Sequence, residues 1–120
     1  MMQKMPIAVL ISGRGSNMRA LIEACERPDF PARIVLVLSN KPDAAGLEVA
    51  RAAGLQTAAI DHKAFGKDRE AHERKVDAAI RASGAQLVCL AGYMRVLTPY
   101  LVNAWDGRML TTHPSLLPAF

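Results

Sequence analysis

Residues 7–26 read IAVLISGRGSNMRALIEACE, and this stretch decides the fold. It opens on an apolar run, residues 7–12, which is typical of a strand buried on both faces of a sheet. A loop with two glycines follows at residues 13–17, here called the glycine loop. Beyond it, apolar residues recur at helical spacing until Pro28 marks the stop. A strand, a glycine-containing turn and a helix in this order predict the start of a βαβ unit.

The same alternation continues along the whole chain. Further strands are expected at residues 34–38, 57–60, 87–91 and 108–112. Helices are expected from a cap at Asp43 to about residue 53, from about residue 69 to 83, and as a turn over residues 99–105. Because strands alternate with helices, the sequence predicts an α/β fold with a Rossmann-like, mostly parallel sheet and flanking helices. Residues 1–120 are expected to form a single domain.

Composition narrows the classes of function. Of the 120 residues, 51% are apolar, which is ample for a core. The net charge of +4 suits an anionic small molecule, whereas the 15 scattered Lys and Arg argue against nucleic acid. No membrane span is expected, because no apolar stretch reaches about 18 residues. Cys25 and Cys89 lie in apolar segments and are expected to be buried free thiols, which suits a reducing cytoplasm.

The glycine loop is a candidate phosphate site. Gly15 allows a close approach of the ligand to the backbone, and the amides and dipole of the following helix favour an anion. Ser16 and Asn17 can add side-chain donors, or either can cap the helix. The alternative is a plain tight turn with a helix cap. Met18 occupies the position of the third glycine of a dinucleotide fingerprint, so a phosphate is favoured over a whole dinucleotide.

A second loop, residues 92–98, follows the fourth expected strand and should lie beside the glycine loop. Its Met94, Arg95, Val96 and Leu97 suit a flat, partly apolar ligand, and the alternative is ordinary packing of the apolar side chains. His113 follows the fifth strand and should share this edge. There it is suited to proton transfer or to hydrogen-bonding a developing oxyanion.

The other two histidines are expected to be structural. His62 and His72 lie in polar segments, for which a solvated face is the better account. The three histidines do not have the spacing of metal ligands, so no zinc site is expected.

Four stretches together resemble a known enzyme family. They are VLISGRGSNMRALIEAC (9–25), LSNKPDAAGLEVARAAG (38–54), LAGYMRVLTP (90–99) and GRMLTTHPSLLP (107–118). They are similar to the amino-terminal part of the phosphoribosylglycinamide formyltransferases, folate-dependent enzymes of purine biosynthesis. Text like HPSLLP is shared with methionyl-tRNA formyltransferase and formyltetrahydrofolate deformylase. The GRGSN loop favours the glycinamide ribonucleotide enzyme among them.

The resemblance implies a role for each candidate residue. Gly15, Ser16 and Asn17 would hold the ribose phosphate of glycinamide ribonucleotide. Arg69 and residues 94–97 would contact the co-substrate 10-formyltetrahydrofolate. His113 would be the catalytic histidine, and no metal is needed.

Two departures from the family pattern affect the catalytic part. The family has Asn-Ile-His where this chain has Thr111, Thr112 and His113. Thr111 would therefore take the place of an asparagine that contacts the formyl group, with a shorter side chain and one donor instead of two. The family's catalytic aspartate lies beyond residue 120. The chain is thus expected to be truncated at its carboxyl end and inactive by itself.

The resemblance also implies a cytoplasmic enzyme with a small-molecule substrate and with no nucleic-acid or membrane partner. Its oligomeric state stays open. Two alternatives remain: an inactive module that binds a phosphate or nucleotide, and another formyl-folate enzyme such as methionyl-tRNA formyltransferase.

Overall fold

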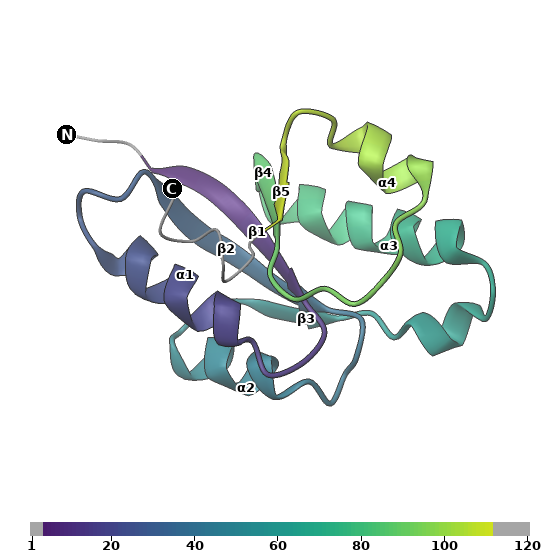
Figure 1. The fold of residues 1–120 in the computed structure, drawn as a ribbon, viewed down its shortest axis with the longest axis horizontal. Coiled ribbons are helices and arrows are strands. Elements are labelled where there is room, and N and C mark those ends of the chain that lie inside the picture. Colours follow the sequence, from purple (N-terminus) through teal and green to yellow (C-terminus); the bar gives the residue numbers. More distant parts are fainter. Residues whose placement is uncertain (1–3, 112–120) are drawn as a thin grey trace.

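The computed structural model describes residues 4–111 and shows a parallel sheet with helices on both faces (Figure 1). The elements in chain order are β1 (Met5–Ile11), α1 (Ser16–Glu26), β2 (Ala32–Ser39), α2 (Ala45–Ala52), β3 (Thr57–Ala59), the 3-10 helix η1 (His62–Phe65), α3 (Arg69–Ala82), β4 (Leu87–Leu90), α4 (Pro99–Ala104) and β5 (Met109–Thr111). The strand order is β3-β2-β1-β4-β5, and every neighbouring pair is parallel. The predicted fold class is confirmed.

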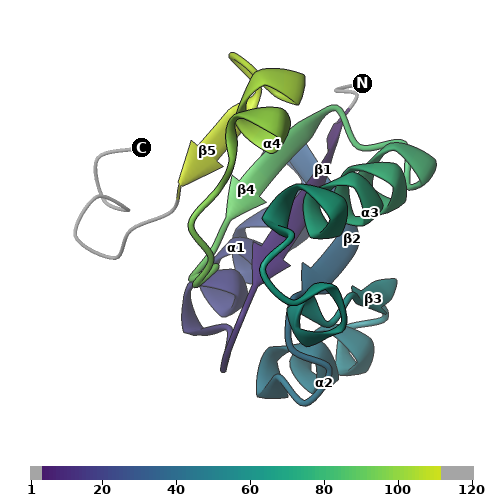
Figure 2. The same ribbon diagram turned by 90° about the vertical axis from the view of Figure 1, so that its right-hand side faces the viewer.

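The central strand β1 is buried on both faces of the sheet. Val9 and Ile11 point into the apolar layer under α1 and α2, where they join Leu47. Leu10 points the other way and joins Ile80 in the layer under α3 and α4. Figure 2 shows the two pairs of helices on opposite sides of the sheet. This two-sided burial explains why the first apolar run has no polar alternation.

The order of the strands creates a switch point beside β1. The chain moves outward from β1 through β2 to β3, and then returns to place β4 on the other side of β1. Residues 7–10 of β1 pair with residues 87–90 of β4. In an open α/β sheet, ligands bind beyond the carboxyl ends of the strands at such a point. The glycine loop and the second loop follow these two strands directly.

Helix caps differ in part from the prediction. Asp43 does not cap α2: Ala44 occupies the N-cap position without a side-chain bond, and Asp43 is exposed. Asp68 caps α3 by accepting the Ala71 N–H at 3.0 Å, and Thr98 caps α4. The prediction for Asp43 was wrong because α2 begins at Ala45, one residue later than it would with Asp43 as its N-cap.

Both cysteines are free thiols, as predicted. Cys89 is buried, and burial raises its pKa to about 11. Cys25 is only half-buried, and burial raises its pKa as well.

Within residues 4–111, no helix combines the length and apolarity that crossing a bilayer requires.

Candidate functional site

The glycine loop is pressed against the first turn of α2. Gly15 is buried with φ of 75°, and a Cβ there would lie 2.9 Å from Met18 Cε and 3.2 Å from Gly46 Cα. The Gly46 N–H donates to the Gly13 carbonyl at 2.9 Å. A Cβ on Gly46 would lie 2.6 Å from Ile11 Cδ1. The loop is therefore held at a backbone-to-backbone contact that only glycines permit.

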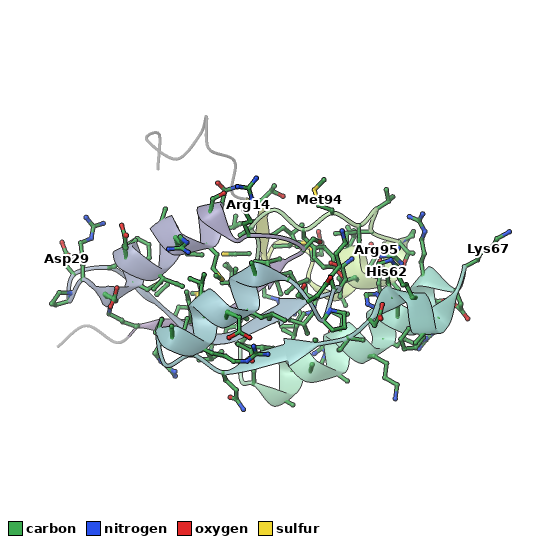
Figure 3. The ribbon with its side chains drawn as sticks, turned by 90° about the horizontal axis from the view of Figure 1, so that it is seen from below. Arg14, Asp29, His62, Lys67, Met94 and Arg95 are labelled. Atoms are coloured by element: carbon green, nitrogen blue, oxygen red, sulfur yellow. The ribbon has the colours of Figure 1, made fainter. Side chains whose placement is uncertain are left out.

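The loop leaves the start of α1 open. Ser16 is the first helical residue and is exposed, Asn17 is half-buried, and no side chain caps the helix. The capping alternative for these two residues is therefore wrong. The first amides of a helix have no partner within it, and together with the helix dipole they favour an anion. Arg14 projects from this loop on the same side of the molecule as Met94 (Figure 3).

The second loop presents apolar side chains outward. It leaves β4 at Gly92, whose φ is 77°. Met94 and Val96 are 76% and 72% exposed, whereas Arg95 is half-buried. Leu97 packs against the layer under α3 and α4. Ordinary packing thus accounts for Leu97 but not for Met94 and Val96.

A buried serine ties the two loops together. Ser12, the residue after β1, accepts the Met94 N–H at 2.7 Å through its Oγ and donates to Asn40 Oδ1 at 2.5 Å. Asn40 Nδ2 lies 3.2 Å from His62 Nδ1. Ser12 and Asn40 are 2% and 1% exposed. Sequence reasoning missed both, although a polar residue at the end of each buried strand was a usable signal.

Helix α3 holds the rest of the second loop. Arg69 Nη1 donates to the Val96 carbonyl at 3.4 Å, so the structure brings Arg69 to the 94–97 segment. The Glu73 carboxylate accepts the Thr98 N–H at 2.7 Å, the Thr98 hydroxyl at 2.6 Å and the Leu101 N–H at 3.1 Å. The segment is therefore fixed from β1 at one end and from α3 at the other.

His72 does not lie on a solvated face, and that prediction was wrong. It is 1% exposed, and its Nε2–H donates to the Ile60 carbonyl at 2.8 Å. Burial is the main cause that lowers its pKa. The reason is position: residues 72, 76 and 80 share the face of α3 that covers the sheet. His62 is half-buried and bonded to Asn40.

The catalytic candidates lie at or beyond the limit of the described residues. Thr111 is exposed at the end of β5, where it pairs with Leu90 of β4. His113 falls outside the described residues. Within the second loop, burial raises the pKa of the Tyr93 hydroxyl to about 12.

No cluster of three metal-ligating side chains occurs among residues 4–111.

The fold and the two loops define a Rossmann-like α/β domain with a candidate ligand-binding edge. Comparison with known proteins gives the family: residues 5–120 match the formyl transferase family model, and the chain belongs to that family. The chain is 46% identical over 116 residues to the phosphoribosylglycinamide formyltransferase of Escherichia coli, and the match covers 97% of this chain and 54% of that enzyme. It is 47% identical over 118 residues to the trifunctional purine biosynthetic protein adenosine-3 of Bos taurus, covering 98% of this chain and 12% of that protein.

Solved structures agree with the sequence relatives. The phosphoribosylglycinamide formyltransferase of Brucella melitensis superimposes with a TM-score of 0.88 at 46% identity, covering 98% of this chain and 61% of that one. A formyltetrahydrofolate deformylase of Pseudomonas putida gives a TM-score of 0.83 at 28% identity, covering 92% of this chain and 38% of that one. The resemblance to the amino-terminal part of the glycinamide ribonucleotide enzymes is confirmed. The chain spans about half the length of those single-function relatives.

Proposed function

We propose that this chain provides the substrate-binding half of a phosphoribosylglycinamide formyltransferase of purine biosynthesis, acting in the cytoplasm. Gly15, Ser16 and Asn17 bind the phosphate of glycinamide ribonucleotide. Arg69 and the 94–97 segment bind 10-formyltetrahydrofolate as co-substrate. The reaction transfers the formyl group from the folate N10 to the glycinamide amine.

The chemistry follows from attack by the amine nitrogen on the formyl carbon. A C–N bond forms to the substrate, a tetrahedral oxyanion develops, and the bond to the folate N10 then breaks. The proton leaving the amine is transferred to N10. His113 stabilises the oxyanion and assists this proton movement, with the Thr111 hydroxyl as a second donor. In this proposal no metal takes part.

One observation carries the proposal. The glycine loop and the 94–97 segment follow the paired strands β1 and β4, and Ser12, which directly precedes the glycine loop, accepts the Met94 N–H at 2.7 Å. The proposed phosphate site and the proposed site for the flat pterin ring would therefore adjoin, as a two-substrate transfer requires. The exposed Met94 and Val96 supply apolar surface without another packing role in the described part of the chain.

Isothermal titration calorimetry of the 120-residue chain tests the proposal. We expect glycinamide ribonucleotide and a formyl-folate analogue each to bind with 1:1 stoichiometry. Asn17→Ala should weaken binding of the ribonucleotide and leave the analogue unaffected. Ser83→Ala, at the C-cap of α3, is the control and should change the binding of neither ligand. Absence of binding by both ligands would refute the proposal.

A second candidate function is a binding module without chemistry. The open start of α1 favours it, because the free first amides of a helix can bind a phosphate without any catalytic group. Binding of the ribonucleotide with no formyl transfer would support this candidate for the isolated chain. Salt-sensitive binding of tRNA would instead support a methionyl-tRNA formyltransferase.

A further inference from the structure

We propose that Ser12 and Asn40 are positioning residues that hold the 94–97 segment against the end of β1 and so set the affinity for the formyl donor. This inference rests on the proposed function for its ligand. It assigns a role to two buried residues that belong neither to the glycine loop, residues 13–17, nor to the 94–97 segment. The structural part of the claim concerns one atom pair, Ser12 Oγ and the Met94 nitrogen.

The hydrogen-bond directions form a single chain. A serine hydroxyl has one donor and two acceptor sites. Ser12 uses its donor on Asn40 Oδ1 at 2.5 Å, which turns its lone pairs toward the Met94 N–H at 2.7 Å. His62 Nδ1 lies 3.2 Å from both the Nδ2 and the backbone carbonyl oxygen of Asn40, so the histidine contacts Asn40 on the side away from Ser12. Asn40 orients the Ser12 hydroxyl, and Ser12 holds Met94.

Burial strengthens the hydrogen bonds of Ser12 and Asn40. Ser12 is 2% exposed and Asn40 is 1% exposed, so water does not compete for their bonds. Removing the Ser12 hydroxyl would leave both the Met94 N–H and Asn40 Oδ1 without this partner. The glycine loop does not depend on this hydroxyl, because its own bond runs from the Gly46 N–H to the Gly13 carbonyl at 2.9 Å.

The near end of the segment depends on this contact more than the far end does. The far end is held at Thr98 by two bonds to Glu73, at 2.7 and 2.6 Å. At the near end the Met94 side chain is 76% exposed, so its own packing contributes little. The bond at 3.4 Å from Arg69 to the Val96 carbonyl is long and exposed. Loss of the Ser12 bond should therefore free residues 94–96 while α4 stays in place.

The test compares Ser12→Ala with Ser83→Ala in the 120-residue chain. Ser83 Oγ also donates a short bond, to the Ile80 carbonyl at 2.5 Å, but it lies at the far end of α3. Two quantities are measured: the hydrogen-exchange rate of the Met94 amide, and the dissociation constants for glycinamide ribonucleotide and a formyl-folate analogue. His62→Ala removes the half-buried side chain that contacts Asn40. It replaces Ser12→Ala in the test if that variant does not fold.

We expect Ser12→Ala to speed hydrogen exchange of the Met94 amide and to raise the dissociation constant of the analogue by about fivefold to tenfold, which corresponds to the loss of one hydrogen bond. The dissociation constant of the ribonucleotide should not change. His62→Ala should give a smaller change of the same kind, and Ser83→Ala none. Equal weakening of both ligands, or an unchanged Met94 amide, would overturn the inference. If the wild-type chain does not bind the analogue, the proposed folate site fails, and the Met94 amide still decides whether Ser12 holds the segment.

Discussion

Glu73 on α3 accepts three hydrogen bonds from the start of α4, two of them from Thr98. Glu73 is 3% exposed, and its carboxylate adds to the cap that Thr98 provides, because it also accepts the Leu101 N–H of the first turn of α4. The contact joins residues 25 positions apart. It fixes where the 94–97 segment ends and the helix begins, so a residue of the sheet-covering face also shapes the candidate folate site.

Glu73→Ala should destabilise the protein by about 2–3 kcal/mol, because it leaves the Thr98 and Leu101 N–H groups without their partner. Urea unfolding followed by circular dichroism measures the loss. Glu70→Ala on the same helix is the control: its ion pair with Arg74 is exposed and should contribute less than about 1 kcal/mol. Similar losses for the two variants would contradict the role given to Glu73.

Gly46→Ala should disturb the glycine loop from outside it. The new Cβ would lie 2.6 Å from Ile11 Cδ1 and 3.0 Å from the Gly13 carbonyl oxygen. We expect a loss of about 1–3 kcal/mol in unfolding free energy, as for other overpacked sites, and weaker binding of glycinamide ribonucleotide. Ala45→Ser, at the exposed first residue of α2, should leave both quantities near wild type. Unaltered ribonucleotide binding by Gly46→Ala would show that α2 does not brace the loop.

The buried His72 should make the stability of the protein depend on pH. Burial lowers its folded-state pKa below 6.5, outweighing the bond to the Ile60 carbonyl, which raises it. The unfolded chain then binds the proton more tightly than the folded chain. The stabilisation is therefore fully present above about pH 6.5 and is lost as the pH falls through 6.5 toward the folded pKa.

The measurement is the unfolding free energy of wild type and His72→Gln between about pH 5 and pH 7.5. Glutamine retains a donor for the Ile60 carbonyl but does not titrate, so the variant should lose less stability on acidification. Identical slopes in the two proteins would exclude His72 as the source.

Thr111→Asn tests the departure from the family at the end of β5. In a protein that contains residues 1–120 and catalyses formyl transfer, the change should raise kcat by about tenfold, because asparagine reaches further. That is a part of the roughly 100- to 1,000-fold that one oxyanion donor contributes. Steady-state kinetics at saturating substrates provide the comparison. An unchanged or lower kcat would show that threonine serves this protein as well as asparagine.

The fold could be predicted because its signals are local. The apolar run of β1, the glycines at φ of 79° and 83° that end α2 and α3, and the proline that starts α4 each act within a few residues. Element ends shifted by one or two residues, as for β1 at Met5–Ile11. The glycine loop and the second loop follow the paired strands β1 and β4, so their neighbouring positions could be predicted as well, and the ligand roles of Arg69 and the 94–97 segment stay predictions.

The missed residues are polar side chains whose partners are distant in sequence. Ser12 and Met94 are 82 positions apart, and Glu73 and Leu101 are 28 apart. Asp77, which accepts the Trp105 Nε1–H at 2.8 Å, is another case. In sequence these residues look like parts of a solvated surface, because a polar type favours water until a specific partner is known. His72 was misplaced for the same reason.

The most direct test of the central claim is ligand mapping by amide chemical shifts in the isotope-labelled 120-residue chain. Glycinamide ribonucleotide should shift the amides of residues 15–17, and a formyl-folate analogue should shift those of residues 94–97. With both ligands present, both sets should shift together. Saturable binding that leaves these two sets unchanged, or shifts confined to the amino ends of the strands, would contradict the account.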